Sequence, residues 1–328
     1  MKPALSVIVF TVLSGAGLGL LVCAALARLA GEAAGGVWRA ALLACVLLGA
    51  GLVSSSLHLA NPRNAWRAFA RFATSWLSRE AVFAVLLVPL VALWLLSIAR
   101  EARALEVVAA AATIACALLV LVCTAMIYAC LKTVPQWNSW HTVLGYPLYG
   151  LMSGAVLWLA VAGPEAASAA AWRTGALVLL AAGLVLKLAT WLRFARPSDL
   201  PLHTALNLPA GRTRLLDPGH SRGTFLTSEF VFALARTRGR LLRWCTLAAG
   251  YALPLALLLA ASAGGASRAF AVPAAVCCLA GLLVERWLFF AEARHVVRLW
   301  HGATDAGDAG GIARSATGTT GTTGAQRA

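Results

Sequence analysis

The run ALSVIVFTVLSGAGLGLLVCAALARLAG, residues 4–31, decides the fold class, because Arg28 is its only charged residue. A helix crosses the hydrocarbon core of a bilayer, about 30 Å thick, with about 20 apolar residues. A cleaved signal peptide has a shorter apolar core of about 7–15 residues followed by a small-residue cleavage site. We therefore interpret the run as a first transmembrane helix.

Similar runs recur along the chain, whose 328 residues are 61% hydrophobic and only 12% charged. Soluble domains contain about twice this share of charged residues. The runs are continuous, whereas the strands of a membrane β-barrel alternate in segments of about ten residues. We expect an all-α polytopic membrane protein with eight transmembrane helices within residues 1–301, at approximately 4–28, 37–60, 81–99, 106–131, 142–163, 171–193, 242–263 and 270–292. The Gly- and Thr-rich tail at 302–328 is predicted to be disordered.

Lys and Arg are concentrated on one side of the predicted membrane. They gather in the connections at 61–80 and 194–241 and after the last span. The positive-inside rule therefore predicts that both termini are cytoplasmic. The net charge of +15 does not indicate nucleic acid as a partner. The charges flank membrane spans, where anionic lipid headgroups account for them.

The segment SSSLHLANPRNAWRAFARFATSWLSRE, residues 54–80, joins the second and third predicted spans. Pro62 suits the first turn of a helix, and Arg63, Arg67 and Arg71 follow at a spacing of four. Aromatic residues fall on the other faces. This pattern predicts an amphipathic segment in the membrane interface, with its guanidinium groups toward headgroups or a partner. A basic interfacial helix without a chemical role is the alternative.

His58 and Glu80 flank this segment, where the second span ends and the third begins. Because the segment returns the chain, both side chains are expected at the same leaflet boundary. Ionisable groups near the hydrocarbon edge are candidates for a functional site. Histidine donates or accepts hydrogen bonds near neutral pH, and a carboxylate accepts protons. The pair suits quinol oxidation, which releases two electrons and two protons.

Further charges lie within the predicted spans at a similar depth, namely Lys187 in the sixth and Glu285 and Arg286 in the eighth. Unpaired charges at this depth are costly. We expect Lys187 and Glu285 to form an ion pair in a buried charge network that includes Arg286. Its role is either a structural link between helices or part of a proton path.

Metal and haem sites are not predicted. All eight cysteines lie in apolar runs without a C-x-x-C motif, which argues against an iron–sulfur cluster or a zinc site in this chain. Cys116, Cys123 and Cys130 recur every seven residues and indicate a packing seam of small residues. Bis-histidine haem needs histidines on facing helices, whereas the histidines near the spans lie at their ends.

Four stretches resemble a known family, the anchor subunits of dimethyl sulfoxide reductase (DmsC). HLANPRNAWRAFARFATSWLSRE is the most specific; MIYACLKTVPQW, SRGTFLTSEFVF and ERWLFFAEARHVV support it. The resemblance covers about residues 5–301 and implies eight spans.

The resemblance implies an anchor in the bacterial inner membrane that oxidises menaquinol and itself holds no haem or iron–sulfur cluster. It implies two partners, a ferredoxin-like subunit with four iron–sulfur clusters and a molybdopterin catalytic subunit. The quinol-binding histidine and glutamate of the family correspond to His58 and Glu80. From the residues themselves we add Arg67, Arg71 and Arg79 as candidates that shape the pocket or the docking face.

Two other function classes are compatible with these residues. A proton-coupled secondary transporter would use His58, Glu80, Lys187 and Glu285, but such transporters commonly have inverted repeats and broken helices at the midplane. The sequence has no clear sign of either. A structural scaffold without quinone chemistry is the third interpretation.

Overall fold

A computed structural model describes residues 3–57, 61–163, 166–195, 209, 234–264 and 267–297. His58, the tail at 302–328 and most of the connection at 194–241 lie outside the described residues. Eight helices in the described part of the chain are long and apolar enough to cross a membrane. The predicted fold class is therefore confirmed.

Most helices follow one another through short connections. The elements are α1 (Leu5–Leu29), α2 (Ala34–Ser56), the 3₁₀ helix η1 (Pro62–Arg71), α3 (Trp76–Ala99), α4 (Arg103–Ala129), α5 (Trp140–Val161), α6 (Ala166–Ala195), α9 (Leu234–Leu247), the π-helical turn η2 (Ala248–Ala252), α10 (Leu253–Gly264) and α11 (Ser267–Ala291). Together α9, η2 and α10 form one span with a π-helical turn inside it.

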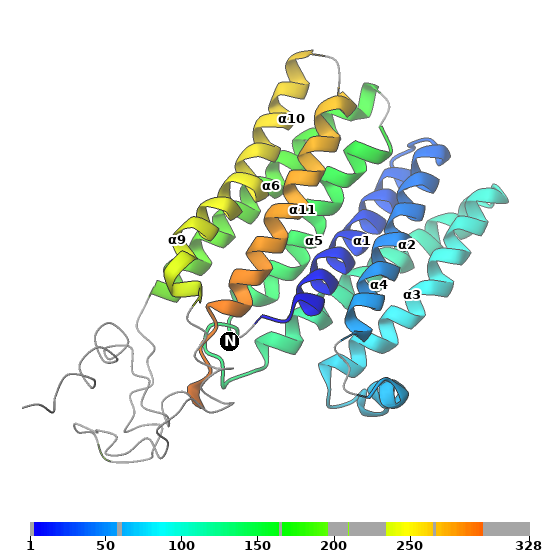
Figure 1. Cartoon of the computed structure of the whole chain (residues 1–328). Coiled ribbons are helices and arrows are strands. Elements are labelled where there is room, and N and C mark those ends of the chain that lie inside the picture. The colour runs from blue at the N-terminus through cyan, green and yellow to red at the C-terminus, as the bar shows by residue number, and fades with distance from the viewer. Residues whose placement is uncertain are drawn as a thin grey trace, which may run out of the picture.

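The helices form a bundle with α1, α5 and α11 in its middle (Figure 1). On one side lie α6, α9 and α10, and on the other lie α2, α3 and α4. Helix α1 packs against α2, α4, α5 and α11. Many of its side chains are accordingly among the buried residues of the core.

Glycines allow α1 and α5 to approach closely. A Cβ atom built on Gly19 would lie 1.8 Å from the carbonyl oxygen of Gly150, and one built on Gly154 would lie 2.1 Å from the carbonyl carbon of Gly19. The backbones therefore touch where any larger residue would separate them. Small residues have this role in many membrane helix pairs, because packing replaces the hydrophobic effect inside a bilayer.

Two sequence-based expectations differ from the structure. The helix that begins at Pro62 is a 3₁₀ helix. With three residues per turn, residues spaced by four are rotated by about a third of a turn, so Arg63, Arg67 and Arg71 do not share one face. Helix α3 begins at Trp76 rather than near residue 81, because the Ser75 hydroxyl accepts a hydrogen bond from the backbone N–H of Ser78.

One end of the bundle carries η1, the connection at 130–139 and the end of α11, and we call it the basic end. Exposed cations there include Arg63, Arg67, Arg71, Lys132 and Arg294. Trp137 Nε1 donates to the carbonyl oxygen of Phe289 at 3.0 Å, which ties the connection to α11. Aromatic side chains pack around this contact in a small buried cluster.

The α1–α5 contact gives a first prediction. Replacing Gly154 with Ala should lower the thermal unfolding temperature of the purified chain in nanodiscs, because the added methyl group meets the backbone of α1. Gly175→Ala is the matched control, since a Cβ there has no neighbour within 4 Å. It should leave stability unchanged or raise it, because Ala favours helix over Gly by about 1 kcal/mol. Equal unfolding temperatures for the two variants would contradict the close packing.

Candidate functional site

Glu80 lies one turn inside α3, rather than at its start as expected from the sequence. Its side chain is buried, with 7% of the residue exposed. Thr124 Oγ1 on α4 is in hydrogen-bond contact with Glu80 Oε1 and also lies 3.0 Å from the carbonyl oxygen of Val120. No described cation forms an ion pair with Glu80, which makes this carboxyl group unusual for the interior of a membrane protein.

A cavity of about 490 Å³ lies beside Glu80. Its wall is formed by α1, α2, α3, α4, α5 and α11 and is mostly apolar. Such a volume and lining are typical of small-molecule sites, which place a few polar groups on an apolar wall. The polar groups that matter most here are Glu80, Thr124, Tyr146 and Arg286. All four lie within two turns of the helix ends that face the basic end.

Part of the cavity wall is also on the outside of the bundle. Leu52 of α2 and Val88 of α3 line the cavity and are 57% and 69% exposed. Helix α2 packs mainly against α1, and α3 packs mainly against α4. The cavity therefore approaches the surface that faces hydrocarbon in a membrane.

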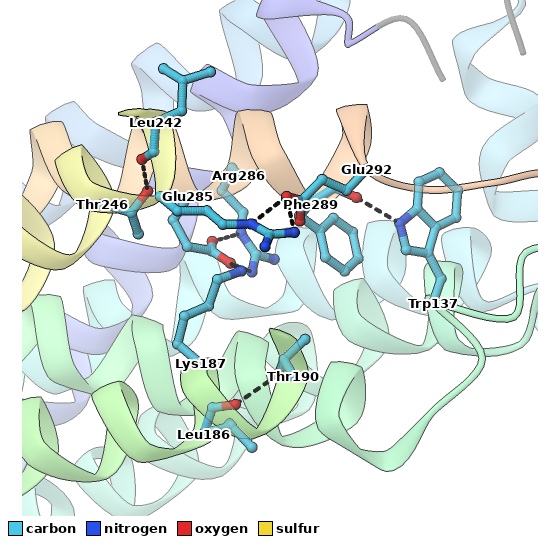
Figure 2. Close-up of polar contacts among 11 residues, drawn as sticks. Trp137, Leu186, Lys187, Thr190, Leu242, Thr246, Glu285, Arg286, Phe289 and Glu292 are labelled. Atoms are coloured by element: carbon cyan, nitrogen blue, oxygen red, sulfur yellow. Dashed lines mark hydrogen bonds and ion pairs between the residues drawn. The ribbon is translucent and has the colours of Figure 1, made fainter. Parts of the chain in front are cut away.

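The buried charge network joins α6 and α11 (Figure 2). Lys187 Nζ donates to Glu285 Oε1 at 2.6 Å, so the predicted ion pair is present. Arg286 Nη2 donates to the same oxygen at 2.8 Å, and its Nε donates to Glu285 Oε2. Lys187 and Glu285 are each 1% exposed and Arg286 is 6% exposed. One carboxylate thus holds two cations.

Arg286 belongs both to this network and to the cavity wall. Its Cζ lies 4.5 Å from the ring centroids of Tyr146 and Phe289. In the sequence, Glu80 and the charge network are separate features, but Arg286 places them on one cavity. Thr124 and Tyr146 are not predicted from the sequence; the only signal for Tyr146 is a polar aromatic residue near the start of an apolar span.

Arg79 has a structural contact at the start of α3. Its Nη2 donates to the carbonyl oxygen of Ala73 at 2.7 Å, and its Nε donates to that of Phe72 at 3.0 Å. Its Cζ lies 4.2 Å from the ring centroid of Trp76. These contacts connect α3 to the end of η1.

Arg67 and Arg71 lie on η1 and are exposed. Neither they nor Arg79 belong to the cavity wall. Among the predicted quinol-binding residues that the structure describes, only Glu80 therefore lines the cavity. The exposed arginines are placed to contact headgroups or a partner.

Comparison with known proteins assigns the family. The family model described as DMSO reductase anchor subunit (DmsC) matches residues 1–291, which include all eight spans. The chain belongs to the DmsC family. A relative from Allochromatium vinosum, the C component of a sulfite dehydrogenase, is 33% identical over 326 residues, which cover 92% of this chain and 99% of that protein.

Membership of the DmsC family makes this chain a multi-pass membrane anchor subunit of a molybdopterin oxidoreductase. An anchor subunit associates with a catalytic oxidoreductase complex. The cavity and the charge network therefore lie in the subunit that connects such a complex to the membrane.

The charge network predicts an order of stability among variants. Glu285→Gln leaves Lys187 and Arg286 as two buried cations without a carboxylate, whereas Lys187→Met leaves one neutral pair. Breaking a buried pair costs about 3–5 kcal/mol, so Glu285→Gln should lower the unfolding temperature in nanodiscs more than Lys187→Met does. Arg103→Gln is a control, because this arginine is 54% exposed in its ion pair with Glu106 and should have a small effect. Equal losses for the two buried variants would show that Glu285 does not hold both cations.

Proposed function

We propose that this chain is the quinone-reactive anchor subunit of its complex, and that the cavity beside Glu80 binds the quinone head group. The observation that carries the proposal is a buried carboxyl group without a cation partner among the described residues, on the wall of a mostly apolar cavity of about 490 Å³. A quinone has a flat apolar ring with two oxygens, which matches an apolar wall with a few polar groups. Its apolar tail would leave past Leu52 and Val88 toward the hydrocarbon.

The chemistry at Glu80 would be proton transfer. Oxidation of a quinol releases two electrons and two protons, and a carboxylate within hydrogen-bond reach of the hydroxyl group accepts a proton. Thr124 keeps the Glu80 side chain in place at the cavity. His58 is proposed as the second group at this site. It lies outside the described residues but follows by three positions Ser55, which lines the cavity.

The electrons would leave through the basic end. We propose that a ferredoxin-like subunit with iron–sulfur clusters docks there and passes them to a molybdopterin catalytic subunit. The exposed Arg63, Arg67, Arg71 and Lys132 supply positive charge for an acidic partner surface. Because Glu80 and Arg286 lie within two turns of this end, quinone and docking surface are close together. The charge distribution supports an inner-membrane orientation with both termini in the cytoplasm.

The direction of electron flow has two candidates. A reductase complex would oxidise menaquinol at this site, as the resemblance of the sequence implies. The relative in Allochromatium vinosum is named as part of a sulfite dehydrogenase, and a dehydrogenase would instead deliver two electrons to the quinone, which takes up two protons. This relative favours the second direction for the present chain. The same groups serve both, because Glu80 can accept or return the proton. Family membership disfavours the transporter considered from the sequence.

Glu80 provides the test of this function. Glu80→Gln keeps the size of the side chain but removes the proton acceptor, and His58→Ala removes a hydrogen-bonding group. In membranes that contain the full complex, electron exchange with a naphthoquinol or naphthoquinone should fall about 10²–10⁴-fold for Glu80→Gln. Activity with a dye that reacts directly with the soluble subunits should persist, because this route bypasses the anchor.

Glu292→Gln is the matched control, since Glu292 pairs with Arg243 at the same end of the bundle but does not line the cavity. It should retain quinone-linked turnover. Normal turnover in both Glu80→Gln and His58→Ala would refute the proposed site. Parallel loss of quinone-linked and dye-linked activity would mean that these residues hold the complex together, as a scaffold requires.

A further inference from the structure

Arg286 has hydrogen-bonding capacity that the protein does not use. Its Nε and Nη2 donate to Glu285, whereas its Nη1 has no hydrogen-bond partner among the described residues. The residue is only 6% exposed. Buried donors almost always have a partner, and leaving one without an acceptor is costly. Since Arg286 also lines the cavity, a ligand there can supply the acceptor.

The charges of the network lead to the same conclusion. Lys187 and Arg286 carry two positive charges and Glu285 carries one negative charge, so the network has one positive charge in excess. Arg286 is its member on the cavity wall. An oxygen with partial or growing negative charge would be attracted to this part of the cavity.

Tyr146 adds a second donor beside Arg286. Its hydroxyl group has no hydrogen-bond partner of normal geometry in the described part of the chain. Its ring lies under the guanidinium group, 4.5 Å from Arg286 Cζ, and it lines the same cavity. Stacking on Tyr146 and Phe289, together with the bonds to Glu285, fixes the plane of the guanidinium group.

The cavity therefore has two polar regions of different chemistry. On α3 and α4, Glu80 with Thr124 exchanges a proton. On α5 and α11, Arg286 with Tyr146 presents donors and positive charge. A ring that carries two oxygens on opposite sides can contact both regions at once.

We propose that Arg286 is a second quinone-binding residue, whose Nη1 donates a hydrogen bond to the quinone oxygen opposite the one that contacts Glu80. Glu285 is a positioning residue, because it holds the other two nitrogens of the guanidinium group. Lys187 keeps Glu285 in place and contributes to the excess of positive charge. This inference rests on the proposed quinone function of the cavity.

The test measures binding of 2,3-dimethyl-1,4-naphthoquinone to the purified full chain in nanodiscs by titration calorimetry. Arg286→Gln should weaken binding about 10- to 100-fold, which corresponds to a hydrogen bond with a charged donor. The variant should remain folded, because Lys187 and Glu285 stay behind as a neutral pair. Arg243→Gln is the matched control: Arg243 is ion-paired with Glu292 at the same end but does not line the cavity. Its affinity should equal that of the wild type.

Arg286→Lys is the second variant and decides the question if Arg286→Gln does not fold. A lysine keeps the charge and can pair with Glu285, but it cannot also present a second nitrogen in the plane of the guanidinium group. Binding should therefore be about 3- to 10-fold weaker than in the wild type.

The outcomes separate the two proposals. If the wild-type chain binds no naphthoquinone, the proposed function of the cavity fails and the inference fails with it. If the wild-type chain binds and the Arg286 variants bind equally well, the role of Arg286 is wrong and the proposed function stands. Equal weakening by Arg243→Gln would also overturn the role of Arg286, because the effect would then be a general loss of charge.

Discussion

The structure depends on how a membrane protein keeps charges inside its apolar interior. Glu285 on α11 holds Lys187 of α6 and Arg286 of its own helix. Water cannot solvate these groups at this depth, so each charge needs a partner within the protein. The contact fixes α11 against α6 and sets the rotation of α11 in the bundle. That rotation places Arg286 on the cavity wall.

The cavity forms where the middle of the bundle meets α2, α3 and α4. Glycines bring α1 and α5 into backbone contact on one side of it, and α2 and α3 pack on different neighbours on the other side. Close packing and incomplete packing thus occur next to each other. A pocket for a lipid-soluble ring needs both: rigid walls that hold polar groups in position, and an apolar side through which the ring and its tail can enter.

The sequence predicts the fold better than it predicts the site. Apolar runs identify all eight spans, because span length is a direct consequence of bilayer thickness. The cost of an unpaired charge predicts the contact between Lys187 and Glu285, which is present. The role of Arg286 could not be predicted, because a guanidinium group beside a carboxylate reads as an ion pair, and only the packing of six helices reveals its free nitrogen. The start of α3 differs from the sequence-based boundary because the Ser75 cap lies before the apolar run begins.

The most direct measurement is a cryo-electron microscopy structure of the full chain, within its complex in nanodiscs, with a saturating naphthoquinone that carries a short alkyl tail. Density for the two-ring head group should lie between Glu80 and Arg286, with one oxygen near each side chain and the tail passing between α2 and α3 toward the lipid. An empty cavity, together with clear head-group density at another place on the bundle, would contradict the account.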